Sequence, residues 1–386
     1  MDKRIRLGLI FSVDENWIGG TYYILNLISA LGTLAAEKQP FITILSKSKT
    51  DLEAAQKTGY SYLDYHNPFD YKRNLSEAAI NKLAKFFTGR DIIDKRISEK
   101  KIDVLFPASN DPCFDRIANK VFWFPDFQHV VYPDFFTPIE LDRRNQMLKE
   151  IAESNKKLVL SSEAARADWQ SLKLNAHCEV HVIPFAVTHP AIDDLDINNL
   201  LKEFDIDKDY FIISNQFWKH KNHQIVLNAA LELFKAGVAF QLIFTGKQDD
   251  KRNPGYYNAI VDFISEHKLK GIIKMLGLID RRKQLKLMQH SKAVIQPSLF
   301  EGWSTVIEDA KSLGKFVIAS DIPVHRAQLI SGGMFFDALN QNQLVAMIQS
   351  FIVSGTVITN VNYDINVNLF GQHFITILLP LKCTYT

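Results

Sequence analysis

The chain has 386 residues, of which 47% are hydrophobic and 23% charged, and its formal net charge at pH 7 is +2. This length favours two domains of ordinary size, and the composition supplies enough apolar material for two cores. The near-neutral charge gives no indication of a nucleic-acid partner, and we predict none. Three cysteines, Cys113, Cys178 and Cys383, have no metal-binding spacing and cannot all pair, which favours a reducing cytoplasm.

The start of the chain places basic residues before the apolar run LGLIFSV, as a signal peptide would. Asp14 and Glu15 follow the run in place of a small-residue cleavage site, so we interpret it as a first buried strand. The late apolar stretch Phe374–Leu381 is too short to span a bilayer and contains Pro380. We therefore expect a cytoplasmic protein that is soluble or peripheral to the inner face of the plasma membrane.

Short apolar runs alternate with longer helical patterns, which is typical of parallel sheets covered by helices on both faces. The first series of predicted strands comprises Leu7–Val13, Phe41–Leu45, Val104–Phe106, Val121–Phe124, Lys157–Leu160 and Val180–Ile183. The second series comprises Tyr210–Ser214, Phe240–Thr245, Ile273–Leu276, Ala293–Gln296 and Phe316–Ala319. The predicted helices are Thr21–Leu34, Ala78–Phe87, Glu140–Asn155, His223–Ala236, Tyr256–His267, Arg282–Gln289 and Ser304–Leu313.

Two doubly wound series in succession predict an α/β protein with two Rossmann-like domains, at residues 1–190 and 205–345. The boundary is placed near Pro184–Asp207, where a proline and a charged stretch intervene. Two open sheets facing each other leave a central cleft at the carboxyl ends of their strands, where ligands usually bind.

The remaining tail, residues 346–386, gives a mixed pattern. Its VITNVNYDINVNLF stretch is polar and β-prone. One helical face before Pro380 is nevertheless compatible with the apolar positions Phe370, Phe374, Ile377 and Leu378. The sequence does not indicate against which domain this tail packs.

The most informative segment is QPSLFEGWSTVIEDAKSLGKFVIASD, in which a strand leads through a loop into a helix. Ser304 is placed to cap that helix, whose first N–H groups suit a phosphate. Glu301 precedes the helix start, and Asp309 lies one turn beyond Thr305 on the same face. Because carboxylates accept hydrogen bonds from sugar hydroxyls, phosphate and carbohydrate would bind side by side. From the residues alone, a loop acid followed by solvated helix acids is an equally good interpretation.

This segment resembles the Glu-x7-Glu signature of family 4 of the retaining glycosyltransferases, which have the GT-B fold. The residues in register with the family pattern are Pro297, Ser298, Glu301, Gly302, Ala310 and Gly314. The resemblance implies that Glu301 contacts the donor sugar. It also implies that the second acid, here Asp309 in place of the usual Glu, holds the ribose hydroxyls, with Glu308 as the alternative.

A second stretch, SNQFWKHKNHQIVLNAALEL, follows a predicted strand and leads into a helix. In the family, an Arg and a Lys five residues later contact the donor diphosphate. Lys221 matches the lysine, whereas Gln216 stands at the arginine position and Lys219 is a neighbouring replacement. Glutamine can hydrogen-bond phosphate but lacks the charged fork of arginine. A solvated basic turn without a ligand is the alternative interpretation.

Two further sites follow from the resemblance. Gly19 and Gly20 open the first helix, where glycine lets the backbone approach a phosphate or the acceptor closely. A tight turn without a ligand would explain the pair equally well. In the second domain, the family's base-binding turn falls on Leu278 and Ile279.

The segment FWFPDFQHVVYPDFF resembles the family's His-Asp segment of the first domain. Asp126 matches the aspartate, but the family histidine falls on Pro125. His129, three residues beyond Asp126, is predicted to replace it in the cleft. A structural role for this histidine among aromatic residues is the alternative.

The segment Ile80–Lys101 combines apolar residues with seven Lys or Arg residues. A basic face beside aromatic side chains suits anionic headgroups, so contact with a membrane surface is one interpretation. An ordinary solvated helix face is the more economical one.

Together, the resemblance implies a metal-independent retaining enzyme. It would move a hexose-type sugar from a GDP- or UDP-linked donor to a glycan or lipid-linked acceptor in bacterial surface polysaccharide or lipopolysaccharide biosynthesis. The predicted catalytic residues are Glu301, Asp126, His129 and Lys221, and the predicted donor-binding residues are Gly19, Gly20, Gln216, Lys221, Leu278, Ile279, Ser304, Thr305, Glu308 and Asp309. No metal ion and no cofactor besides the donor is expected. A nucleotide-sugar epimerase of the same fold and an inactive nucleotide-sugar-binding module are the alternatives.

Overall fold

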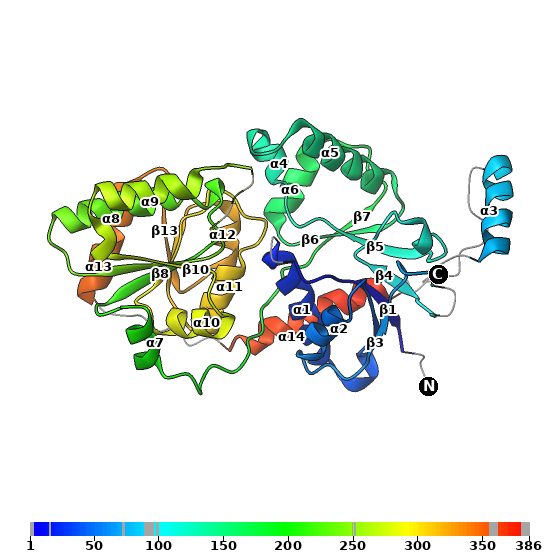
Figure 1. The fold of residues 1–386 in the computed structure, drawn as a ribbon, viewed down its shortest axis with the longest axis horizontal. Coiled ribbons are helices and arrows are strands. Elements are labelled where there is room, and N and C mark those ends of the chain that lie inside the picture. Colours follow the sequence, from blue (N-terminus) through cyan, green and yellow to red (C-terminus); the bar gives the residue numbers. More distant parts are fainter. Residues whose placement is uncertain are drawn as a thin grey trace, which may run out of the picture.

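A computed structural model describes residues 4–14, 17–71, 74–88, 96–97, 100–248, 250, 252–354 and 362–379. The chain forms two α/β domains that lie side by side, each built on one parallel sheet with helices on both sides (Figure 1). None of the described helices is long and apolar enough to cross a bilayer.

The first sheet has seven parallel strands in the order β3-β2-β1-β4-β5-β6-β7. They are β1 (Arg6–Ile10), β2 (Phe41–Leu45), β3 (Leu63–His66), β4 (Val104–Phe106), β5 (Asn119–Trp123), β6 (Lys157–Leu160) and β7 (Glu179–Val182). The helices are α1 (Ile18–Gly32), α2 (Lys49–Gln56), α3 (Leu75–Thr88), α4 (Gln128–Val131), α5 (Pro138–Glu153) and α6 (Glu163–Ser171). Three short 3-10 turns complete this domain: η1 (Ala36–Lys38), η2 (Pro112–Phe114) and η3 (Pro133–Phe135).

The second sheet has six parallel strands in the order β10-β9-β8-β11-β12-β13. They are β8 (Tyr210–Ser214), β9 (Gln241–Thr245), β10 (Ile273–Gly277), β11 (Val294–Gln296), β12 (Val317–Ser320) and β13 (Gly333–Phe336). The helices are α7 (Ile197–Glu203), α8 (His223–Lys235), α9 (Tyr256–Glu266), α10 (Arg281–His290), α11 (Thr305–Ser312), α12 (Pro323–Gln328) and α13 (Gln341–Ser354), with 3-10 turns η4 (Lys219–Lys221) and η5 (Leu269–Gly271).

The predicted pair of doubly wound parallel sheets is confirmed. The predicted strands were recognisable because central parallel strands are buried on both faces and read as continuous apolar runs. The strands β3 and β13 were not predicted. Each lies at the edge of its sheet and is only partly buried, so its sequence lacks such a run.

Both sheets reverse their strand order at a central position. β1 lies between β2 and β4, and β8 lies between β9 and β11. At such a switch point the connections leave toward opposite faces of the sheet, which opens a crevice at the carboxyl ends of the strands. The loops after β1, β8 and β11 are therefore the places from which a ligand site is built.

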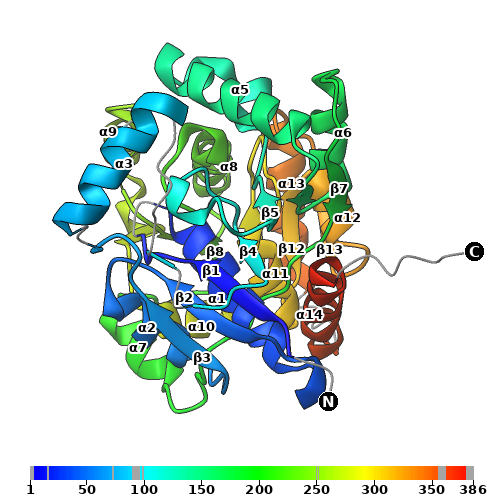
Figure 2. The same ribbon diagram turned by 90° about the vertical axis from the view of Figure 1, so that its right-hand side faces the viewer.

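The tail returns to the first domain. The helix α13 packs against α8 of the second domain, whereas α14 (Asp364–Leu378) packs along α1 of the first (Figure 2). Phe370 and Phe374 are buried in the core of the first domain, where the ring of Phe374 lies 4.8 Å from that of Phe106. The β-prone interpretation is wrong from Asp364 onward, because the helical spacing of the apolar positions outweighs the strand preference of individual residues.

The contact between α14 and α1 depends on Gly371. A Cβ atom added at this position would overlap the carbonyl group of Ala30 in α1. The two helices thus approach each other more closely at this point than any other residue type allows.

We predict that Gly371→Ala lowers the free energy of unfolding by about 1–3 kcal/mol, because the added methyl group forces the helices apart. Gly32→Ala is the matched control. It also lies in a helix, but its Cβ would meet only the ring of Tyr60, at 3.4 Å. Alanine there should be neutral or stabilising by up to about 1 kcal/mol. Denaturant unfolding measures both, and equal stability of Gly371→Ala and the wild type would contradict the prediction.

Candidate functional site

A cavity of about 240 Å³ lies between the two sheets, at the carboxyl ends where both strand orders reverse. The first domain contributes the start of α1 and the loop after β5, and the second contributes the loops after β8, β9, β10 and β11. Of the predicted site residues, those that line the cavity are Gly19, Gly20, Asp126, Gln216, Lys221, Leu278, Ile279, Glu301, Ser304, Thr305 and Asp309. His129 and Glu308 do not line it.

The start of α11 forms one end of the cavity. Ser304 caps this helix, and its Oγ accepts a hydrogen bond from the N–H of Ile307 at 3.3 Å. The first N–H groups of a helix have no partner within it, so this end offers donors and partial positive charge. Gly302 lies in the preceding loop, where a Cβ would overlap the carbonyl oxygen of Pro125 in the first domain. Glycine therefore lets the two walls meet at this point.

Glu301 carries a fixed negative charge in the cavity wall. The Nζ of Lys221 lies 2.6 Å from its Oε1, and Nε2 of Gln296 donates to the same oxygen at 2.8 Å. Burial raises the pKa of Glu301, but the charge of Lys221 and hydrogen bonds to the carboxylate outweigh burial and bring the pKa below its usual value. The carboxylate is thus ionised at neutral pH, and its orientation is held by two partners.

Lys221 is positioned by the turn that follows it. Asn222 adopts the left-handed conformation, with φ of 54°, which asparagine tolerates better than most residues. Its Nδ2 donates to the carbonyl oxygen of Pro297 at 3.2 Å and to that of Ala338 at 2.9 Å. These bonds tie the turn after β8 to the loop after β11, so Lys221 and Glu301 are held by one connected framework.

Gln216 occupies the wall beside Lys221. Its Nε2 is buried and has no hydrogen-bond partner in the described part of the structure. A buried amide donor without a partner is costly, and a ligand oxygen would satisfy it. Lys219 does not line the cavity, and its Nζ lies 5.5 Å from the centre of the Phe135 ring. The replacement of a missing phosphate cation by Lys219 therefore finds no support in this arrangement.

The neighbouring acids of α11 point to different partners. Asp309 lines the cavity, and its Oδ1 lies 2.6 Å from Nη2 of Arg281. Glu308 points away, where it accepts hydrogen bonds from Tyr363 Oη at 2.5 Å and from Gln328 Nε2 at 3.0 Å. Successive residues of a helix differ by about 100° in direction, so the two acids cannot share one face. This arrangement favours Asp309 over Glu308 for a ligand in the cavity.

Asp126 and His129 also differ in whether they line the cavity. Asp126 lines the cavity and accepts a hydrogen bond from the N–H of Gln128 at 3.0 Å. His129 is buried between the rings of Phe124 and Phe136, and neither of its ring nitrogens has a partner in the described structure. Burial, with a smaller effect from Arg144, lowers the pKa of His129 to about 4. The imidazole is therefore neutral, and the fold does not bring it to the cavity.

The first-domain wall is aromatic as well as glycine-rich. Gly20 lies against the ring of Trp17, where a Cβ would be 2.6 Å from the nearest ring carbon. The ring of Trp17 stacks on that of Trp123 at 5.4 Å. From the second domain, the indole N–H of Trp303 donates to the carbonyl oxygen of Phe185 at 2.9 Å. These contacts give the cavity an apolar rim beside its charged centre.

Several lining residues were not predicted from the sequence, among them Arg281, Gln284, Gln128, Trp218 and Trp303. Arg281 lies in the first turn of α10, in a run of basic residues that is ordinary for an exposed helix. The contact of Arg281 with α11 can be recognised only from the structure, in which α10 and α11 lie side by side. The tryptophans lie within the recognised motifs, and a large aromatic side chain on such a loop is the signal that identifies them.

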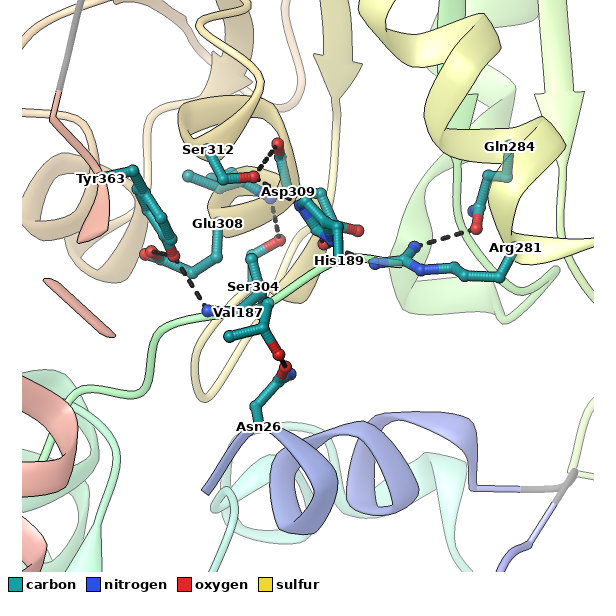
Figure 3. Close-up of polar contacts among 12 residues, drawn as sticks. Asn26, Val187, His189, Arg281, Gln284, Ser304, Glu308, Asp309, Ser312 and Tyr363 are labelled. Atoms are coloured by element: carbon teal, nitrogen blue, oxygen red, sulfur yellow. Dashed lines mark hydrogen bonds and ion pairs between the residues drawn. The ribbon is translucent and has the colours of Figure 1, made fainter. Parts of the chain in front are cut away.

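The segment that first crosses between the domains is attached to both of them (Figure 3). The N–H of Thr188 donates to Oδ1 of Asn26 in α1 at 2.8 Å. The next residue, His189, reaches α11, where its Nε2 lies 2.5 Å from Oγ of Ser312. The crossing is therefore attached to α1 of the first domain and to α11 of the second.

The returning segment is attached at the same place (Figure 3). The Oη of Tyr363 accepts a hydrogen bond from the N–H of Val187 at 3.1 Å and donates to Glu308. Tyr363 is itself buried. One tyrosine thus connects both crossings to the helix that begins at the cavity.

Residues 197–362 match the protein family described as "Glycosyl transferases group 1", so this part of the chain carries a glycosyltransferase domain. No curated protein sequence matches the chain.

Among solved structures, the fold is similar to a glycosyltransferase from Rickettsia africae, with 16% identity and a TM-score of 0.65 over 97% of this chain and 93% of that one. It is also similar to HepE from Anabaena in complex with UDP and glucose, with 13% identity and a TM-score of 0.64 over 97% and 95% of the two chains. WaaG, a glycosyltransferase involved in lipopolysaccharide biosynthesis, shares 10% identity and a TM-score of 0.58 over 97% and 95%. At these identities the likeness establishes the fold, and the predicted GT-B arrangement is confirmed.

We predict that Tyr363→Phe lowers the free energy of unfolding by about 1–3 kcal/mol, because it leaves Glu308 buried with one partner fewer and removes the bond to Val187. Tyr257→Phe is the matched control, since that half-buried ring packs on the Phe217 ring at an interplanar angle of 85°. The control should change stability by less than about 0.5 kcal/mol. Denaturant unfolding compares the two variants, and a Tyr363→Phe protein as stable as the control would show that the tyrosine does not fasten the crossings.

Proposed function

We propose that this chain is a retaining glycosyltransferase that moves a hexose-type sugar from a UDP- or GDP-linked donor to a glycan or lipid-linked acceptor. The observation that carries the proposal is the ion pair of Lys221 and Glu301 at the start of α11. It places a cation for phosphate and an acceptor for sugar hydroxyls next to each other, within the cavity formed by both switch points. The related fold of HepE, solved with UDP and glucose, supports a nucleotide-sugar ligand.

The diphosphate is assigned to the charged centre of the cavity. Lys221 supplies the cation, the buried Nε2 of Gln216 supplies a donor without a partner, and the start of α11 supplies the backbone N–H of Thr305. The N–H of Ser304 is not among these donors, because it donates to Oε1 of Gln328 at 2.9 Å. Gly19 and Gly20 face this centre from the first domain. Together these groups replace the two cations of the family pattern by one cation and several neutral donors.

The rest of the donor extends from that centre in two directions. Its sugar is assigned to Glu301, which must exchange Lys221 for the hydroxyls as the lysine turns to the phosphate. Its ribose is assigned to Asp309, and its base to the wall at Leu278 and Ile279. Asp126 lies across from Glu301 on the first-domain side and orients the sugar or the acceptor.

In the proposed reaction, the acceptor hydroxyl oxygen forms a bond to the anomeric carbon on the face that the leaving phosphate occupies. The bond from that carbon to the phosphate oxygen breaks, and its electron pair stays on the phosphate. The hydroxyl proton moves to the same phosphate, so the anomeric configuration is retained. Lys221 and the helix start stabilise the charge that grows on the leaving group, which is the largest contribution expected.

The proposed reaction requires no metal ion, because Lys221, Gln216 and the start of α11 already supply the donors for the diphosphate. The chain does contain Asp-x-Asp sequences, at residues 194–196, 205–207 and 207–209. None of these aspartates lines the cavity.

A lipid-linked acceptor would be met at a membrane, and α3 supplies a surface for that contact. On this helix the polar Glu77 and Asn81 are buried, whereas the large apolar side chains of Leu75, Leu83, Phe86 and Phe87 are exposed. Lys82 and Lys85 are exposed on the same helix, whose one acid is the buried Glu77. An exposed apolar surface with lysines and no acid suits an anionic lipid headgroup layer. Much of the remaining predicted segment, including residues 89–95, lies outside the described residues.

We predict that Glu301→Gln reduces transfer by at least about 100-fold, because it removes the charged acceptor while keeping the shape of the side chain. Glu163→Gln, a change of an exposed acid on α6, is the matched control and should leave the rate unchanged. UDP- and GDP-hexoses are incubated with lipid-linked and free glycan acceptors, and the products are identified by mass spectrometry. Full activity of Glu301→Gln would overturn the assignment. Conversion of the donor without an acceptor would indicate an epimerase, and binding without turnover an inactive module.

We predict that the protein co-floats with vesicles of phosphatidylglycerol and phosphatidylcholine, and that Phe86→Ser/Phe87→Ser reduces the bound fraction severalfold. Ile330→Ser/Leu339→Ser removes two equally exposed apolar side chains from the second domain and is the matched control. Equal flotation of both double variants would show that α3 is not the contact surface. No flotation of the wild type would remove the membrane from the proposal.

A further inference from the structure

Asp309 combines burial with an open hydrogen-bond acceptor. Its side chain is 1% exposed, yet it belongs to the cavity wall. Oδ1 is taken by Arg281, whereas Oδ2 is buried without a hydrogen-bond partner in the described structure. A carboxyl oxygen that is removed from water and left without a donor is costly, so its presence in the cavity wall indicates a ligand that donates to it.

Arg281 is held on three sides. Its Nη2 lies 2.6 Å from Oδ1 of Asp309, and its Nη1 donates to Oε1 of Gln284 at 2.9 Å (Figure 3). Its guanidinium also lies 4.9 Å from the centre of the Tyr22 ring. Tyr22 belongs to α1 of the first domain, so the guanidinium is fixed from both domains. A planar guanidinium held in this way defines the direction of the carboxylate that it binds.

The other basic group beside Asp309 does not compete for this role. Nε2 of His189 lies 3.8 Å from Oδ1 and faces Ser312 at 2.5 Å. Burial lowers the pKa of His189 more than Asp309 raises it, so the ring is neutral at pH 7. Arg281 is therefore the positively charged partner of the Asp309 carboxylate.

We infer that Arg281 is a positioning residue for donor recognition. By binding Oδ1, it holds the carboxylate of Asp309 in one rotamer, and it leaves Oδ2 to accept from the vicinal hydroxyls of a ribose. The inference rests on the proposed function, because it takes the ligand to be a nucleoside diphosphate. It also gives a reason for the shorter acid, since the guanidinium fills space that a glutamate side chain would need.

The test measures ribose discrimination, defined as the dissociation constant of the 2′,3′-dideoxynucleoside diphosphate divided by that of the ribonucleoside diphosphate. UDP and GDP are the probes, titrated by calorimetry. In the wild type, loss of hydrogen bonds to a charged acceptor should give a ratio of about 10 to 100. Arg281→Met should bring the ratio close to 1, mainly by weakening the binding of the ribonucleoside diphosphate. Arg281→Lys keeps the charge without the fork and should give an intermediate ratio.

Arg282→Met is the matched control. Arg282 is the next residue of α10, is paired with Asp194 at the surface, and should leave the ratio unchanged. Should Arg281→Met fail to fold, as shown by its circular dichroism, Arg281→Lys carries the test, and a wild-type ratio in that variant overturns the inference.

Other outcomes separate the inference from the proposed function. An unchanged ratio in Arg281→Met, or an equal loss of affinity for both nucleotides, overturns the inference and leaves the proposed function standing. A wild type that binds UDP or GDP without discriminating ribose overturns the inference too. A wild type that binds neither diphosphate overturns the proposed function and the inference with it.

Discussion

The attachment of both domain crossings to α11 is the constraint on which the rest of the structure depends. The hydroxyl of Tyr363 joins Val187 of the first crossing to Glu308 of the helix. This bridge requires the carboxylate of Glu308 to be buried. Its burial is tolerated because the carboxylate has three partners: Tyr363, Gln328 and Lys311. Since both crossings are attached to α11, any motion that opens or closes the cleft must act on the helix whose start forms one end of the cavity.

The centre of the cavity also contains buried charges that are held by their partners. A buried ion pair such as Lys221 and Glu301 rarely adds stability over apolar residues, because desolvation offsets the attraction. The presence of this pair is explained if each of the two residues binds a part of a ligand. Bound to each other, they stay ionised and oriented without a ligand; separated by one, they offer opposite charges to different parts of it. The close approach of Gly302 to Pro125 brings the first-domain wall within reach of the same ligand.

The sequence predicted the fold well because central parallel strands are continuous apolar runs, whereas the half-buried edge strands β3 and β13 escaped notice. Local motifs also placed Glu301, Lys221 and Ser304 at the cavity, since each lies on a loop directly after a recognisable strand. Pairwise contacts between distant elements were not predictable. Glu308 and Asp309 differ in their partners, which are Tyr363 and Arg281, and these partners lie in other helices or segments. His129 was predicted to reach the cleft from its spacing to Asp126, but the short turn of α4 directs its ring into an aromatic core.

The proposed function requires that the cavity bind a nucleoside diphosphate through Lys221 and the start of α11. The most direct measurement is a crystal structure of the protein grown with UDP or GDP. We expect diphosphate oxygens within hydrogen-bonding distance of the Lys221 Nζ and of the backbone N–H of Thr305, with the Lys221–Glu301 contact broken. A diphosphate bound elsewhere, or one that leaves the Lys221–Glu301 pair intact and untouched, would contradict it.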